Sequence, residues 1–377
     1  MKTATASHRS FHVAEKILRF PVLAVALAAA LQAGAAELIK ADNTTNLALQ
    51  ASYTNAAADT GTGDTIRFDQ TLVNNGAFSW SADNVAALRV VDPGLAITIN
   101  MTGGSTYGLT NAAGPVIDMS AATQNLTLSN GTLRLRGDAT NGATIAVAAG
   151  RTLSVQTKLT YNNGSGLANI RVAGAGNVTV GGVNGVIQNK DVSNITSFTH
   201  DGTGTVTFSN ANTYSGGTLL KSGTLVAGNA GALGAGAVTV TGGTLDLNGA
   251  SALTLALASG QNLSMSSGTL SFSLGTSSDQ IASAGSAGFT LSGGTLALIL
   301  GSGFDYNNVY QLFSGFSSGL SSVSGLTISG YDTVNYTASL STAGLLEFTA
   351  TSIPEPSTYA VIVGGFALVG CVTRRRR

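Results

Sequence analysis

Hydrophobic residues recur at every second position in short segments along most of the chain, and Gly, Asn and Ser separate these segments. Such alternation puts one face of an extended segment in a core and the other in water, which is typical of a half-buried β-strand. The alternating sets are Ile66/Phe68, Leu126/Leu128, Leu133/Leu135, Ile145/Val147, Val178/Val180, Val206/Phe208, Val238/Val240, Leu245/Leu247, Leu253/Leu255/Leu257, Leu270/Phe272/Leu274 and Leu296/Leu298/Leu300. The pattern predicts an all-β protein.

The strand segments return with a period. The phrase Gly-Thr-Leu begins at Gly223, Gly243, Gly268 and Gly294, in steps of 20, 25 and 26 residues. A repeat of about 20 to 30 residues made of strands and turns is the mark of a solenoid of stacked coils. We therefore predict a right-handed parallel β-helix, or β-solenoid, over residues 37–301.

An antiparallel sandwich is the alternative fold, because Asn-Gly pairs favour two-residue hairpin turns. Such pairs include Asn130-Gly131, Asn141-Gly142, Asn163-Gly164, Asn184-Gly185 and Asn248-Gly249. Regular recurrence of one phrase favours the solenoid.

One segment within residues 199–249 carries a recognisable motif. It has a Gly-x-Gly-x-Val-x-Phe strand at 202–208, an Asn-x-Tyr-x-Gly-Gly-Thr bend at 212–218 and a Gly-Thr-Leu strand at 223–225. This segment resembles the autotransporter-associated β-strand repeat, also called the passenger-associated transport repeat. The resemblance implies a β-helical extracellular repeat and carries no reaction with it.

The amino end has the three parts of a secretory signal peptide. Positive residues (Lys2, Arg9, Lys16 and Arg19) precede the apolar run 20–31, and an Ala-x-Ala site follows at residues 33–35. We expect residues 1–36 to direct export through the Sec machinery, with cleavage after Ala35 or Ala36. The apolar run is short of the roughly 20 residues needed for an anchoring helix.

The carboxyl end combines Pro354, Glu355 and Pro356 with an apolar stretch at 360–372 and then Arg374, Arg375, Arg376 and Arg377. Residues 353–377 resemble the PEP-CTERM sorting signal, which membrane enzymes called exosortases recognise. The resemblance implies a short transmembrane helix, transient anchoring in the inner membrane, and delivery to the cell surface, the outer envelope or the medium. The prolines keep the motif extended and the arginines hold the end in the cytoplasm. A plain tail anchor is the alternative.

Residues 302–352 are richer in aromatic side chains than the repeats, and we expect them to cap the open end of the solenoid. The aromatic residues are Phe304, Tyr306, Tyr310, Phe313, Phe316, Tyr331, Tyr336 and Phe348. A ligand groove is the alternative reading. Trp80, the only tryptophan, is expected in the core or a cap rather than in a sugar-binding platform.

Charge narrows the range of partners. Residues 37–353 contain 10 Lys/Arg and 16 Asp/Glu, which gives 10 − 16 = −6, and no Lys or Arg lies between Ser222 and Thr373. Nucleic acid binding needs a basic patch, so nucleic acid is not an expected partner.

Few residues offer chemistry. His200 and Asp201 are adjacent and should point to opposite faces of a strand, so we expect a solvated turn there and no catalytic dyad. Arg134 and Arg136 with Asp138 are the nearest approach to a polysaccharide-cleaving site. Residues 301–305 weakly resemble one calcium-binding nonapeptide, and the lone Cys371 lies in the tail.

We therefore expect no catalytic residue, metal or cofactor. The predicted function is an exported structural or adhesive β-solenoid with extracellular polysaccharide as a candidate partner. The alternative is a β-helix polysaccharide lyase or glycoside hydrolase.

Overall fold

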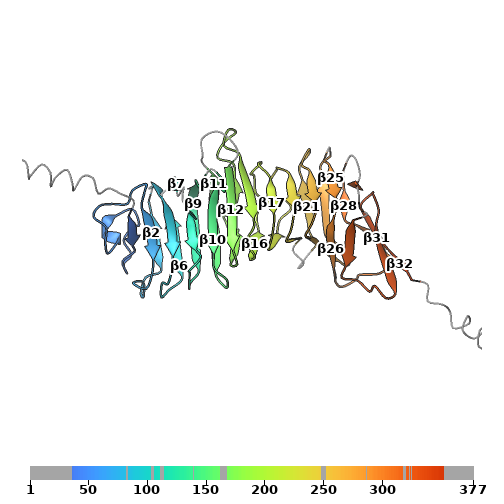
Figure 1. Cartoon of the computed structure of the whole chain (residues 1–377), viewed down its shortest axis with the longest axis horizontal. Helices are drawn as coiled ribbons and strands as arrows, with labels where there is room; N and C mark the ends of the chain where they lie inside the picture. Colours follow the sequence, from blue (N-terminus) through green and yellow to red (C-terminus); the bar gives the residue numbers. More distant parts are fainter. Residues whose placement is uncertain are drawn as a thin grey trace, which may run out of the picture.

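The computed structural model describes residues 36–351, apart from 82–83, 103–105, 111–113, 139, 162–167, 248–251, 286, 317–319, 322 and 324. This part is a rod in which short strands stack along the long axis, in chain order from one end to the other (Figure 1). The signal peptide and the sorting tail lie outside the described residues. Within the described part, no helix is long and apolar enough to cross a membrane.

Two long sheets form the walls of the rod. The first has 12 strands: β1 (Glu37–Ile39), β2 (Thr65–Phe68), β5 (Ala87–Val90), β8 (Ile117–Met119), β10 (Ala143–Val147), β12 (Ala168–Gly174), β15 (Thr196–His200), β17 (Thr218–Leu220), β19 (Val238–Val240), β22 (Leu263–Met265), β25 (Phe289–Leu291) and β29 (Leu320–Ser321). Each pairs in parallel with the strand one coil later, so the predicted parallel β-solenoid is confirmed.

The second sheet has 14 strands. Its main path is β3 (Ala77–Trp80), β6 (Ile97–Met101), β9 (Leu126–Leu135), β11 (Thr152–Tyr161), β13 (Asn177–Val180), β16 (Thr205–Phe208), β18 (Thr224–Ala227), β20 (Thr244–Asp246), β23 (Thr269–Leu274), β26 (Gly294–Leu300) and β30 (Leu326–Ser329). Three side strands complete it: β4 (Asn84–Val85), β7 (Thr106–Leu109) and β14 (Val186–Gln188).

The interior is made of columns of side chains, one from each coil. The register of the first sheet places Ile66, Leu88, Ile117, Ile145, Val172, His200, Leu220, Val240, Met265 and Leu291 in one inward column. Apart from His200 these residues are apolar, and all are buried. Trp80 is also fully buried in the core, as expected. The alternation read from the sequence thus becomes one continuous apolar interior.

The Asn-Gly pair at Asn130 and Gly131 makes a corner instead of a hairpin. Both residues have left-handed backbone, with φ of 59° and 55°. Before the pair, β9 runs beside β6, and after it, β9 runs beside β7. In the next coil the hydroxyl of Thr157 donates to the carbonyl oxygen of Gly131 at 3.0 Å. The antiparallel sandwich is therefore rejected.

The carboxyl end combines two kinds of pairing. The short strand β28 (Phe313–Ser314) continues a parallel three-stranded sheet with β21 (Thr254–Leu257) and β24 (Gln280–Ser283), and β29 and β30 also pair in parallel. Three further strands, β27 (Tyr310–Gln311), β32 (Leu345–Ala350) and β31 (Tyr336–Leu340), form an antiparallel sheet. Parallel coiling thus extends beyond residue 301.

A glycine of the repeated phrase offers a test of coil stacking. A Cβ at Gly223 would lie 2.5 Å from the carbonyl oxygens of Gly202 and Gly204, with φ at +67°, whereas a Cβ at Gly150, with φ at +71°, would meet nothing within 4 Å. We expect Gly150→Ala to cost about 1 kcal/mol from backbone strain alone. Gly223→Ala should cost about 3 kcal/mol or more, because a coil must also move. Urea unfolding midpoints measure both, and equal losses would contradict the close stacking.

Candidate functional site

At the bend of the repeat motif, a buried asparagine side chain makes hydrogen bonds to the neighbouring coils. Asn212 lies between β16 and β17, and its Oδ1 accepts from the amide of Ile187 in the preceding coil at 2.7 Å. Its Nδ2 donates to the carbonyl oxygen of Ala232 in the following coil at 2.6 Å. One side chain, 6% exposed, therefore joins three successive coils at a bend where only single backbone hydrogen bonds, from the amides of Asn212 and Thr213, otherwise link them.

Tyr214 and Thr218 complete this bend. The Thr218 hydroxyl donates to the carbonyl oxygen of Leu233 at 3.2 Å, so the fully buried Tyr214 hydroxyl donates to Thr218 Oγ1 at 2.6 Å. Burial raises the pKa of Tyr214, which stays neutral. A Cβ on Gly234 would come within 3.1 Å of the Tyr214 ring, so the next coil packs directly on it. The motif residues thus build a polar connection inside the core.

His200 is buried in the inward column, so the expected solvated turn is wrong. The strand alternation continues through β15 and carries the imidazole inward, where Nδ1 lies 3.4 Å from the carbonyl oxygen of Val172 and Nε2 lies 3.1 Å from that of Gly204. Burial lowers the pKa of His200. Asp201 turns outward and pairs with Arg171 Nε at 2.8 Å, so the two neighbours form no dyad.

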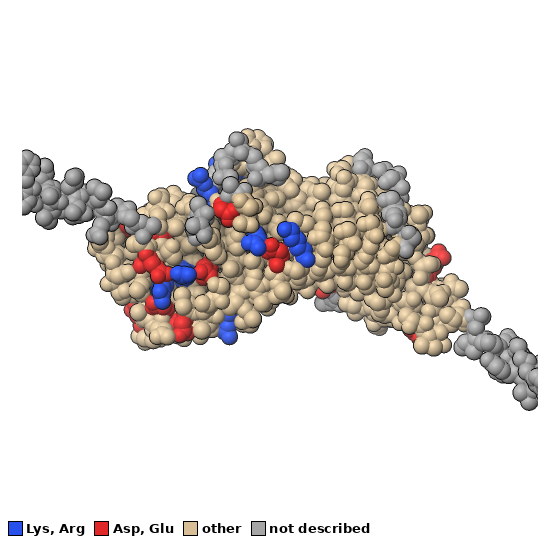
Figure 2. Space-filling view, in the orientation of Figure 1, with Lys and Arg blue, Asp and Glu red and all other residues tan. Residues whose placement is uncertain are grey.

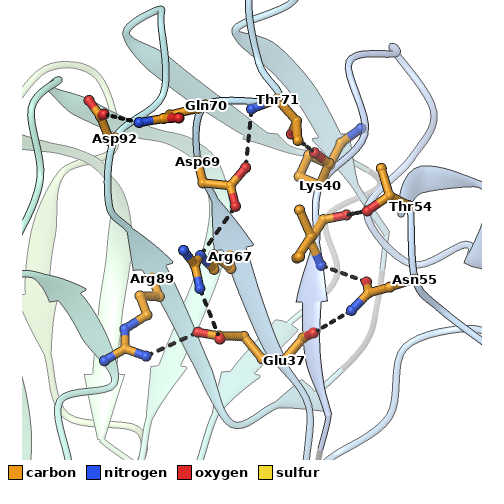
Figure 3. Close-up of polar contacts among 11 residues, drawn as sticks. Glu37, Lys40, Thr54, Asn55, Arg67, Asp69, Gln70, Thr71, Arg89 and Asp92 are labelled. Carbon is orange, nitrogen blue, oxygen red and sulfur yellow. Dashed lines mark hydrogen bonds and ion pairs between the residues drawn. The ribbon is translucent and has the colours of Figure 1, made fainter.

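A cluster of charged side chains lies on the outer face of the first sheet, near the amino end of the rod (Figure 3). The register places Arg67 beside Arg89, and Glu37 lies between the two guanidinium groups, at 3.2 Å and 3.0 Å. Asp69 pairs with Arg67 at 3.3 Å, and Asp118 pairs with Arg89 at 3.2 Å. These partly exposed pairs offset like-charge repulsion between the arginines and add little net stability.

Side chains also close the edge of the first strand. The side chain of Asn55 makes the hydrogen bonds that a neighbouring strand would make. Its Oδ1 accepts from the amide of Ile39 and its Nδ2 donates to the carbonyl oxygen of Glu37, both at 2.8 Å (Figure 3). The amide of Thr54 donates to the carbonyl oxygen of Ile39 at 3.0 Å. An unpaired edge is a template for unwanted strand pairing, so this end of the rod is protected.

Lys40 anchors the segment that covers this end. Its fully buried Nζ donates to the carbonyl oxygens of Ala41, Asn43 and Ser52 and to Asn43 Oδ1, at 2.8 to 3.2 Å. The ammonium also lies 4.5 Å from the centre of the Phe78 ring. Burial lowers the pKa of Lys40 to about 8, which still leaves it mostly charged at neutral pH.

Charge is distributed unevenly along the rod. On the face drawn in Figure 2, Lys and Arg gather over the first half, and the rest is almost free of them. The second half presents hydroxyl groups instead. Cross-strand pairing aligns Thr205, Thr224, Thr244, Thr269, Thr295 and Thr327 in one outer column of the second sheet.

The residues considered for catalysis are not assembled into a site. Within the described residues, Arg134 and Arg136 form no ion pair with a carboxylate. Asp138 holds a turn instead: its Oδ1 accepts from the amides of Asn141 at 2.6 Å and Thr140 at 2.8 Å. These backbone hydrogen bonds, that of Asn141 first, lower the pKa of Asp138.

The part of the chain that the structure describes contains no group of three His, Cys, Asp or Glu residues that could hold a metal ion. In the segment compared with a calcium nonapeptide, Asp305 Oδ1 accepts from the amide and the side chain of Asn307, both at 2.9 Å.

Sequence reasoning missed the roles of the buried Lys40 and Asp279 and of the exposed Asn55. Asp279 lies under the turn after β23, and its carboxylate accepts from the amides of Leu253 at 2.7 Å and Ser273 at 2.6 Å. A single polar residue among Ser, Thr and Gly gives no periodic signal. For Asn212 a signal existed, because its Asn-x-Tyr spacing belongs to the repeat motif.

Comparison with known families agrees with this picture for one segment. The family model described as the passenger-associated-transport-repeat matches residues 198–227, which include Asn212, Tyr214 and Thr218. Comparison with the curated proteins and with the solved structures found no match. The repeat read from the motif is therefore confirmed for a small part of the chain.

Asn212 generates a stability prediction. Asn212→Ala should cost about 2 to 4 kcal/mol, because it leaves a buried amide and a buried carbonyl in neighbouring coils without partners. Asn189→Ala, which removes an asparagine that is less buried, is the control and should cost less. Unfolding midpoints compare them, and hydrogen exchange should show faster opening of Ile187 in the first variant only.

His200 generates a pH prediction. Its pKa is lowered in the folded state, so below the ordinary value near 6.5 the unfolded chain binds more protons than the folded one. Stability should be complete above about pH 7 and fall as the pH drops through 6.5, with a slope of at most about 1.4 kcal/mol per pH unit. His200→Leu should flatten this slope between pH 7.5 and 5.5. Parallel profiles for the two proteins would contradict the assignment.

Proposed function

We propose that the protein is an exported structural or adhesive rod that acts at the cell surface or in extracellular polymer. The supporting observation is that a passenger-associated repeat lies within an uninterrupted series of parallel coils. A β-solenoid carrying this repeat suggests an exported, autotransporter-like passenger at the cell surface. We also propose that the solenoid winds in the right-handed sense, as is expected for parallel crossover connections.

The mode of action we propose is geometric and not catalytic. A stiff rod holds its outer columns at a fixed spacing of about 4.8 Å from strand to strand, so many weak contacts can act together. The outer column of six threonines described above offers such contacts, and extracellular polysaccharide is the partner we propose. No residue is assigned a catalytic role.

We propose that the antiparallel sheet caps the carboxyl end. Phe348 on β32 contacts the rings of Phe304, Tyr306 and Tyr310 at 5.1 to 6.4 Å between centroids, and Tyr306 stacks on Tyr336 at 3.9 Å. This cluster covers part of the last coils, where strand edges would otherwise face water.

Export and anchoring follow from the ends of the sequence. We propose entry through the Sec machinery by way of the signal peptide, and processing by an exosortase-type enzyme at Pro354, Glu355 and Pro356. Arg374, Arg375, Arg376 and Arg377 would hold the transmembrane segment in place until that step.

Mass spectrometry of the mature protein in separated cell fractions tests this proposal. We expect a new amino end at residue 36 or 37 and a carboxyl end near Pro356, in the outer envelope or the medium. Replacing Pro354 and Pro356 by Ala should leave the arginine end intact and retain the protein at the inner membrane. An intact Arg377 in the inner membrane of the wild type would instead indicate a plain tail anchor.

A further inference from the structure

A shallow, open groove with a volume of about 370 Å³ lies in the carboxyl half of the rod, between the turn after β23 and the start of β27. One wall is formed by Gly275, Thr276, Ser277, Ser278 and Gln280, and the other by Asn308, Val309, Tyr310 and Gln311. Its volume lies within the range of small-ligand sites. None of the lining residues is charged.

Four polar side chains of the groove are free to bind a ligand. Within the described part of the chain, the side chains of Thr276, Ser277, Gln280 and Asn308 make no hydrogen bond. These hydroxyl and amide groups can both donate and accept, and they come from both walls. Val309, which is 53% exposed, adds an apolar patch between them.

Both walls are held in place before any ligand arrives. Asp279, buried below the first wall, accepts the two backbone hydrogen bonds described above. In the second wall, the Tyr310 hydroxyl accepts from the amide of Asp305 at 2.8 Å and lies 3.0 Å from its carbonyl oxygen. The amide of Thr276 donates to the carbonyl oxygen of Ser302 at 3.0 Å, which joins the first wall to the next coil. A preorganised site loses less entropy on binding.

We infer that this groove binds a short stretch of a neutral glycan. Uncharged hydroxyl and amide groups beside an apolar patch complement the hydroxyl groups and C–H faces of a sugar. Between Ser222 and residue 351 the formal charges are all negative, from Asp246, Asp279, Asp305, Asp332 and Glu347, so an anionic polysaccharide would be repelled. This inference rests on the proposed adhesive function and gives it one defined contact site.

The test measures binding of hexasaccharides to the purified full-length protein by calorimetry. The probes are uncharged β-1,4-, β-1,3- and α-1,6-linked glucose hexamers, an uncharged chitin hexamer and, as the charged arm, a galacturonate hexamer. We expect at least one uncharged hexamer to bind and the galacturonate hexamer not to bind. The double variant Thr276→Ala/Asn308→Ala, which removes one polar group from each wall, should weaken that binding about tenfold or more.

Thr239→Ala/Ser264→Ala is the matched control, because it removes a pair of hydroxyl groups from the outer face of the first sheet. This control should leave the affinity unchanged, and thermal melting should show that both double variants remain folded. Binding of the galacturonate hexamer alone, equal losses in both variants, or no binding by any neutral hexamer would overturn the inference. A second assay measures adhesion of the wild type and of the groove variant to polysaccharide-coated beads. Equal adhesion of the two proteins would also overturn the inference, but the proposed adhesive function would stand.

Discussion

The structure depends on backbone hydrogen bonds that each coil can make only with its neighbours. A coil of short strands buries too few apolar side chains to offset the entropy of ordering its backbone, so it cannot fold alone. Stacking supplies both the missing hydrogen bonds and the missing buried area. Parallel pairing satisfies the backbone amide and carbonyl groups, and it aligns the inward side chains into columns. The residues of one column, from Ile66 to Leu291, are spread over ten coils and form a single core.

Where stacking cannot use a ladder, side chains must make these hydrogen bonds. Asn212 supplies an acceptor to β14 in the preceding coil and a donor to the following coil, and Asn55 supplies both to β1, the first strand of the described part. Asp279 holds a turn by accepting two amides. Each side chain makes hydrogen bonds that, in the interior coils, the backbone of the adjacent strand makes.

The outer face is free of this requirement and can therefore vary along the rod. Ion pairs around Arg67 and Arg89 occupy the first half, whereas uncharged hydroxyl columns and the neutral groove occupy the second. A rod with two chemically different halves can be held at one part and bind at another. The adhesive role proposed above would use this arrangement.

By itself, the sequence determined the strands, their parallel stacking and the repeat at residues 198–227, because alternation and a repeated phrase are local signals. Only the tertiary structure decided what the exceptions do. Asn130-Gly131 has the local chemistry of a hairpin turn, yet coils on both sides hold β9 extended past it as a corner. His200 read as a polar residue beside a turn, and the registers of β12 and β17 carry it into the core. The groove likewise joins residues about 30 positions apart, which one coil of stacking brings together and no local pattern records.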